Sequence, residues 1–435
     1  KPLNFKNIYV SGLTYNQSLY LLKNFIDNKD TLTFNKFKKE YYKLVSDDQI
    51  ESIFPRAKYN DNTGFYNLFL NVKREKPFGA RIGGLISSDN LNEGFLGAEY
   101  KYLTKVALSL YGNIYFGKFY SSVYGRLRLD NLTKSSFYLQ SFISMNRYDY
   151  YRGSSFIFYE DNRPLYILQS ERLIGAEMAF PIRNQAKFNS GVAFNDFSYQ
   201  YYQINSFSLK DTTDNSTFYG FTPFMAYERN TLNNKNFATN GHFFKAEIRY
   251  YLGTESYTPG STAIIKESSK HQHQWYYVSL KSKDYFYFTR HFNIGLCSNV
   301  VLSNQPLFSN YTATLLMSSA YNPTFHASTI YIEQYRNPSF AGAGLEFIYN
   351  LTQNVHWRVE SYHFLAFNPI VKTDNGFKEN INKVGKYAQN YSSSLVFTSP
   401  IANISLSVNY YPWHTQGWFG QFNIGFLIYN RSFHP

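Results

Sequence analysis

The chain of 435 residues carries a net charge of +13, and aromatic side chains make up 20% of it, with 42 Tyr and 41 Phe. This aromatic share is far above ordinary globular usage, and the Lys and Arg residues are scattered without a clustered stripe, which speaks against nucleic acid as a partner. No run of about 18 apolar residues occurs, which excludes a transmembrane helix. The single cysteine, Cys297, allows no internal disulfide and sets no metal framework.

The mean hydropathy of −0.40 is that of a soluble chain. Transmembrane strands, however, escape hydropathy because every second residue is polar. The opening residues, KPLNFKN, contain no apolar signal region, so we expect the chain to be mature or a fragment of something longer. A basic barrel facing anionic lipid headgroups accounts for the positive charge.

Residues 1–76 are predicted to form a small α+β domain. The order is strand, helix, helix, strand, strand, because apolar residues recur first with a period of two, then with helical spacing, then with a period of two again. Its helices would cover one face of a three-stranded sheet. The predicted elements cover residues 5–11, 16–25, 35–45, 53–59 and 65–73. An unrelated α+β cap is the alternative.

Residues 77–435 are predicted to form a transmembrane β-barrel of about sixteen antiparallel strands, the even number expected of a bacterial barrel. Strands 244–250, 402–410 and 421–429 alternate apolar residues, placed outward, with polar residues, placed inward. The last of them places Phe426 and Ile428 outward. Aromatic residues near strand ends would supply an interfacial girdle, namely Tyr410, Tyr411, Trp413, Trp418 and Tyr429.

The region 331–362 gives the clearest alternation. Within 342–349 the apolar side chains share one face and Glu346 lies on the other, and after a short turn His356, Arg358 and Glu360 share the polar face. A charged strand face is costly in a dry core but not in a wet lumen. The apolar face therefore points to lipid.

Connection lengths give the orientation. Connections after even-numbered strands are mostly tight, while those after odd strands are often long, with exceptions at 116–118 and 230–240. Because barrels of this kind have short periplasmic turns, the small domain is expected in the periplasm and the long loops outside the cell. The partners expected on this basis are outer-membrane lipid and lipopolysaccharide.

A small domain of this order feeding sixteen strands resembles the Omp85 superfamily, whose periplasmic units are POTRA domains. The first strand, NIYVSGL, is similar to the usual POTRA opening. The sixth outer loop of that family carries a (V/I)RG(F/Y) tetrapeptide, and here the loop 305–338 contains YRNPSF. Arg336 matches the family's arginine, while Asn337 replaces its glycine. The resemblance implies that Arg336 meets an acidic residue in the lumen, either Glu360 or, as second candidate, Glu346.

Within that superfamily the wording YRNPSFAGAGLEFIYNL resembles the barrel half of bacterial patatin-like phospholipases of the PlpD type. Such proteins carry an N-terminal patatin lipase, then one POTRA domain, then the barrel. The resemblance implies a barrel in the bacterial outer membrane that anchors a lipase domain absent from this chain and could also export it. Two alternatives stay open. One is a non-catalytic docking subunit of an outer-membrane complex or a homodimer, and the other is a translocase for other polypeptides.

The residues that catalysis would need are missing from these 435 residues. No Gly-x-Ser-x-Gly elbow, Walker loop or dinucleotide fingerprint occurs, so no catalytic site and no cofactor are predicted. His271 and His273 lack a third ligand nearby, so no metal site is predicted. The inward carboxylates Glu247, Glu346 and Glu360 are expected to form lumen ion pairs with Lys245, Arg249 and Arg358.

Overall fold

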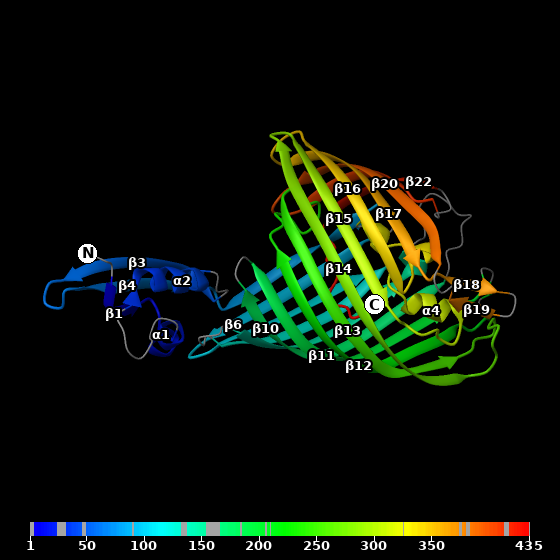
Figure 1. Cartoon of the computed structure of the whole chain (residues 1–435), viewed down its shortest axis with the longest axis horizontal. Coiled ribbons are helices and arrows are strands. Elements are labelled where there is room, and N and C mark those ends of the chain that lie inside the picture. Colours follow the sequence, from blue (N-terminus) through cyan, green and yellow to red (C-terminus); the bar gives the residue numbers. More distant parts are fainter. Residues whose placement is uncertain are drawn as a thin grey trace.

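The computed structural model describes residues 4–23, 32–45, 49–88, 91–131, 137–153, 166–182, 185–204, 207–208, 210–324, 326–373, 376–379, 383–412 and 417–434. It shows a closed barrel of sixteen antiparallel strands preceded by a small α+β unit (Figure 1). The predicted fold class is therefore confirmed. Among the described residues, no helix has the length and apolar character needed to cross a membrane.

The N-terminal unit is a four-stranded sheet in the order β2-β1-β4-β3, with one helix on either side of β2 in sequence. Three strands were predicted. The fourth is the two-residue β2, which pairs with the start of β1. The end of the first predicted helix, residues 24 and 25, lies outside the described residues. The elements are β1 (Asn4–Ser11), α1 (Tyr15–Leu22), β2 (Leu32–Thr33), α2 (Phe34–Val45), β3 (Ile50–Asn60) and β4 (Phe65–Arg74).

The barrel wall is built from sixteen strands that pair with their neighbours in chain order, and β22 closes onto β5. They are β5 (Phe78–Ser87), β6 (Glu93–Leu103), β7 (Ala107–Gly117), β8 (Tyr120–Asn131), β9 (Phe137–Asp149), β10 (Ile167–Ile182), β11 (Ala186–Tyr201), β12 (Asp214–Asn230), β13 (Gly241–Thr258), β14 (Ser269–Thr289), β15 (Phe292–Ser303), β16 (Ser339–Asn350), β17 (Val355–Phe367), β20 (Val384–Thr398), β21 (Asn403–Tyr410) and β22 (Trp418–Gly425).

Smaller elements lie in the connections between wall strands. They are α3 (Tyr150–Gly153), α4 (Tyr311–Met317), the 3-10 turns η1 (His326–Ser328) and η2 (Glu333–Tyr335), and the hairpin β18 (Ile370–Thr373) and β19 (Gly376–Glu379). α4 and the hairpin lie at the end of the barrel opposite the N-terminal unit (Figure 1). That end is where the long connections gather.

The two faces of the wall differ as predicted. In β17, Trp357 is 50% exposed on the outside, while its neighbour Arg358 is 2% exposed on the inside. In β21, Leu406 points outward and Ser405 and Ser407 are buried inward. An apolar outer face and a polar interior are the pattern of a membrane-spanning barrel.

The N-terminal unit contacts the barrel at the turn between β6 and β7. Tyr20 of α1 packs against Leu103 and Ala107. Gln17 Nε2 donates to the Leu103 carbonyl at 3.3 Å, and Gln49 Nε2 donates to Ser109 Oγ of β7 at 3.0 Å. The unit is therefore docked at the end of the barrel that carries the short turns.

The last strand ends earlier than predicted. β22 stops at Gly425, and residues 426–434, here called the lumen segment, turn into the barrel. Gly425 has φ +113, and a Cβ at this position would lie 2.1 Å from the Gly84 carbonyl oxygen. Only glycine fits this turn without strain. The outward placement of Phe426 and Ile428 on a continuing strand is therefore wrong.

The predicted aromatic girdle is correct only in part. Trp418 is exposed on the outer face and its ring lies 4.8 Å from that of Tyr410. Tyr411 is fully buried, and the Tyr429 ring packs inside against Tyr120 and Tyr148. Trp413 lies outside the described residues. The two interior tyrosines belong to segments that leave the wall, which alternation along a strand does not reveal.

Candidate functional site

The lumen is filled by the connection between β15 and β16, residues 305–338, here called the lumen loop. Its helix α4 is buried inside the barrel. Asn310 caps α4 by accepting from the Ala313 amide at 2.8 Å, and it donates to Tyr201 Oη of the wall at 2.7 Å. The Ser309 amide donates to Glu255 Oε1 of β13 at 2.8 Å. Wall side chains thus hold the loop across the channel.

Arg336 lies in the lumen, but the predicted lock with Glu360 or Glu346 is not the arrangement found. Its guanidinium lies 4.9 Å from the Tyr331 ring centre and donates to the Leu316 carbonyl at 3.3 Å. A longer contact of 3.5 Å joins it to Tyr150 Oη. No ion pair joins Arg336 to a carboxylate within the described residues. Burial raises the pKa of the Tyr331 phenol, so this ring stays neutral under the cation.

Asn337 stands where the resemblance implies a glycine, and its side chain makes hydrogen bonds that a glycine could not make. Its Nδ2 donates to the carbonyls of Ser339 and Phe367, each at 2.7 Å, and its amide donates to the Ser319 carbonyl at 3.0 Å. The Asn337 side chain therefore fastens the loop to the ends of β16 and β17. A glycine could make only the backbone contact.

Glu346 and Glu360 both form ion pairs with Arg358. The Arg358 Nε donates to Glu360 Oε1 at 2.7 Å, and Nη2 bonds to Glu346 Oε2. Tyr285 and Tyr362 also donate to Glu346, at 2.9 and 2.8 Å. The lumen ion pairs predicted for Arg358 are thus found, and because both carboxylates are satisfied, neither is available to Arg336.

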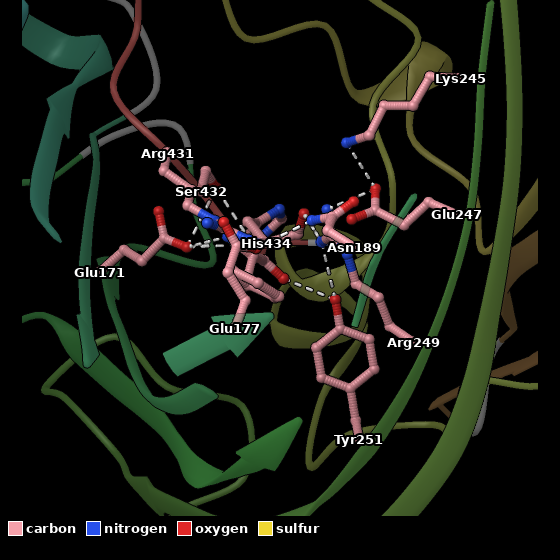
Figure 2. A network of polar contacts seen from close by, with 11 residues as sticks. Glu171, Glu177, Asn189, Lys245, Glu247, Arg249, Tyr251, Arg431, Ser432 and His434 are labelled. Carbon is pink, nitrogen blue, oxygen red and sulfur yellow. Dashed lines mark hydrogen bonds and ion pairs between the residues drawn. The ribbon is translucent and has the colours of Figure 1, made fainter. Parts of the chain in front are cut away.

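A second row of lumen charges lies on β13. Lys245 Nζ and Arg249 Nη2 each lie 2.9 Å from Glu247 Oε2, as the sequence predicts. Figure 2 shows this row facing Arg431, Ser432 and His434 of the lumen segment. The segment thus lies between the β13 row and Glu171 and Glu177 of β10.

Sequence reasoning missed the lumen segment. Alternation of apolar residues continues from Phe422 to Ile428, which indicates a strand. The signals against a strand were Gly425, where the chain turns, and the pair Asn430 and Arg431, whose polar side chains follow each other without alternation. All three residues can be read from the sequence, but none of them shows whether the segment lies in the barrel wall or in the lumen.

The junction of β5 and β22, here called the seam, is the shortest pairing in the wall. The two strands share three residue pairs, Asn423–Ser87, Ile424–Ile86 and Gly425–Leu85. By contrast, β10 and β11 share sixteen pairs. Within the described residues, 78–83 of β5 have no partner strand on that side. In hydrocarbon, unpaired backbone groups cost several kcal/mol each.

A cavity of about 450 Å³ lies inside the barrel beside the seam. It is lined by Arg358, Glu346 and Glu360, by serines of β20 and β21, and by Leu427, Ile428 and Tyr429 of the lumen segment. The charged and hydroxyl groups on its wall side can bond to water or to a polypeptide backbone.

Nothing in the described part of the chain assembles a metal site. No group of three His, Cys, Asp or Glu residues is placed to hold a metal there. His271 and His273 lie within β14, and His273 Nε2 is 2.7 Å from Glu255 Oε2. Cys297 donates to Glu346 Oε1 at 3.1 Å. His273 and Cys297 thus each bond to a carboxylate of the barrel wall.

No family model and no curated protein matches the sequence. Solved structures do match in fold. BamA from Haemophilus ducreyi lacking POTRA domains 1-3 has a TM-score of 0.60 at 13% identity, over 97% of this chain and 84% of that chain. CdiB from Acinetobacter baumannii has a TM-score of 0.55 at 9% identity, over 98% and 74%. CdiB from Escherichia coli has a TM-score of 0.53 at 11% identity, over 98% and 76%. The likeness extends over the N-terminal unit and the barrel.

Proposed function

We propose that this chain is an Omp85-type outer-membrane barrel that engages other polypeptides at its seam, with the N-terminal unit as a POTRA-like domain in the periplasm. The domain boundary falls between residues 76 and 77. The observation that carries this proposal is the seam, where the edge of β5 is left open over residues 78–83. An open strand edge pairs readily with an incoming extended segment.

The filled lumen supports the same function. The lumen loop and the lumen segment occupy the interior, so the barrel is unsuited to free diffusion of solutes. Every other junction of the wall shares at least seven residue pairs, against three at the seam, so the seam is the junction that opens at least cost. The docked N-terminal unit would guide a polypeptide arriving from the periplasm toward this place.

A more specific version of this function follows from the sequence YRNPSFAGAGLEFIYNL, which resembles the barrel half of patatin-like phospholipases. In that form the barrel anchors a patatin lipase domain encoded upstream of Lys1 and could also export it. The intact mass of the native polypeptide, with peptide mapping, tests it. A product heavier by a whole domain that contains Gly-x-Ser-x-Gly supports this form, and a product beginning near Lys1 rejects it.

The second candidate is a docking scaffold in an outer-membrane complex or a homodimer. The observation that favours it is the sheet of the N-terminal unit, whose β3 edge carries the exposed Phe54. In this case partners would bind the N-terminal unit, and the seam would stay closed.

Photo-crosslinking in living cells separates these functions. A photoreactive amino acid replaces Ile82 on the open edge of β5 or, as matched control, Ile174 on the fully paired β10. Both side chains face outward, 84% and 60% exposed. The proposal predicts polypeptide adducts at 82 and none at 174. Equal adducts at the two positions would contradict it, and adducts only from a probe at Phe54 would favour the scaffold.

A further inference from the structure

The lumen segment is held as a bound peptide is held, not as a seventeenth strand. From Asn430 to His434 its backbone bonds to side chains of the wall. The Asn430 amide donates to Tyr120 Oη at 2.9 Å, and the Phe433 and His434 amides donate to Glu171 Oε1 at 2.7 and 3.1 Å. Contacts of this kind can be exchanged without breaking a β-ladder.

The carbonyl groups of the segment also accept hydrogen bonds from side chains of the wall. Ser144 Oγ and Asn146 Nδ2 donate to the Arg431 carbonyl at 2.8 and 3.0 Å. Tyr251 Oη donates to the Phe433 carbonyl at 2.6 Å. The wall strands β8 to β13 therefore recognise the extended backbone, which any sequence would present.

Two side chains of the segment add selectivity. Arg431 Nη2 lies 2.7 Å from Glu177 Oε2, and its guanidinium lies 3.9 Å from the Phe142 ring centre. Phe433 packs against Phe142 and against Phe224, with ring centres 6.1 and 4.8 Å apart. A buried carboxylate beside an aromatic ring selects a guanidinium, and the next pocket selects a ring.

Glu171 is the wall residue whose hydrogen bonding depends most on the lumen segment. Its side chain is 1% exposed and accepts from two backbone amides and Ser432 Oγ of the segment, and from Asn146 Nδ2 of β9. Most of the donors that satisfy this buried carboxylate thus come from the segment, as Figure 2 shows for Ser432 and His434. With the segment withdrawn, the carboxylate needs replacement donors, and the amides of another peptide are the groups that fit.

We propose that the lumen wall from β8 to β13 is a binding site for an extended polypeptide with arginine two residues before an aromatic residue, and that the lumen segment is its resident occupant. The ligand class rests on the proposed function, in which polypeptides reach the barrel. The site lies beside the cavity at the seam, since Leu427, Ile428 and Tyr429 line that cavity. An incoming segment would therefore meet the resident one.

A peptide-binding experiment tests the site without requiring transport. In one variant, residues 428–434 are replaced by a Gly-Ser sequence of the same length. The probe is a fluorescent peptide with the sequence of residues 428–435, IYNRSFHP, and its binding to the barrel in detergent micelles is followed by anisotropy. Heat-modifiable electrophoretic mobility shows that the barrel is folded. The control peptide carries Arg431→Gln and Phe433→Ala.

We expect saturable binding of the probe to the Gly-Ser variant. The control peptide should bind this variant about tenfold more weakly or worse. The probe should lose affinity by a similar factor when the Gly-Ser variant also carries Glu171→Gln and Glu177→Gln. The unaltered chain, whose site is occupied, should bind the probe weakly. Equal binding of the two peptides, or no binding to the folded Gly-Ser variant, overturns the proposal.

If the Gly-Ser variant does not fold, the full chain carrying Arg431→Gln and Phe433→Ala replaces it. Its segment is loosened rather than removed, so it should bind the probe more tightly than the unaltered chain, and unchanged binding overturns the proposal. Crosslinking at position 82 is independent of this assay, so failure of the peptide site and failure of the proposed function can be told apart.

Discussion

At the scale of single residues, the lumen arginines have separate roles. Arg358 neutralises two buried carboxylates of neighbouring strands, while Arg336 stacks on Tyr331 and bonds to the carbonyl at the end of α4. His434 Nε2 of the lumen segment lies 2.7 Å from that same Leu316 carbonyl. Arg336 therefore stabilises the contact between loop and segment, and Arg358 stabilises the wall.

Arg358→Ala should destabilise the barrel strongly. It leaves Glu346 and Glu360 buried without their cation, and breaking a buried pair in this way costs about 3–5 kcal/mol. The midpoint of urea unfolding in micelles measures it. Arg172→Ala, which removes an exposed pair with Asp196, is the matched control and should change stability by about 1 kcal/mol or less. Equal effects of the two substitutions would contradict this role.

Arg336→Ala should loosen the lumen loop and leave intact the ion pairs of Arg358 with Glu346 and Glu360. The loss of one buried charged donor is worth about 1–3 kcal/mol. Limited proteolysis should cleave within residues 305–338 faster in this variant, and single-channel conductance should rise. Glu360→Gln is the control, because Glu360 does not contact the loop arginine. Equally fast cleavage in Glu360→Gln would show that the arginine pairs with this carboxylate after all, and unchanged cleavage in Arg336→Ala would contradict its role in holding the loop.

At the scale of elements, the wall was predictable and the lumen was not. Alternation in β16, β17 and β21 fixes which side chains face outward because lipid and water impose opposite demands on the two faces. The ion pairs of Arg358 and Arg249 could be predicted since their partners lie two residues away on the same strand or, for Glu346, on the inward face of the adjacent strand. The contacts of Arg336 could not, because they depend on the path of a long loop through space.

The turn at Gly425 decides whether the chain stays in the wall. Gly425→Ala places a Cβ against the Gly84 carbonyl and disfavours the positive φ, a strain of about 1–3 kcal/mol. We expect the lumen segment to be partly displaced, which protease cleavage between residues 426 and 434 would detect. Gly79→Ala is the control, because an added Cβ there meets open space. An undisturbed segment in Gly425→Ala would count against glycine as the cause of the turn.

At the scale of the whole molecule, the N-terminal unit is joined to the barrel by a small contact. Tyr20 fills the space between α1 and the turn at Leu103 and Ala107. Because that contact involves few side chains, one substitution should release it. The sequence placed the unit at the short-turn end correctly, yet it held no sign of Tyr20 as the anchor, since its helical spacing fits a domain core equally well.

Tyr20→Ala should therefore widen the distribution of distances between the unit and the barrel without unfolding either. Spin labels on the exposed face of β3 and on the barrel rim, measured by pulsed electron resonance, report this distribution. Tyr15→Ala is the control, because Tyr15 is exposed on the same helix. A distribution that stays narrow in Tyr20→Ala would mean that the hydrogen bonds of Gln17, Lys23 and Gln49 are enough to hold the unit.

The central claim is that polypeptides engage the barrel at the seam, where they pair with the open edge of β5 and separate the three residue pairs that join it to β22. The most direct test joins β5 to β22 by a disulfide between Ile86→Cys and Ile424→Cys in a Cys297→Ser background, since positions 86 and 424 are paired across the seam. A photoreactive residue at position 82 reports engagement in the same chain. The account predicts polypeptide adducts in the reduced protein and their loss on oxidation. Equal adducts in the oxidised and reduced forms would contradict it.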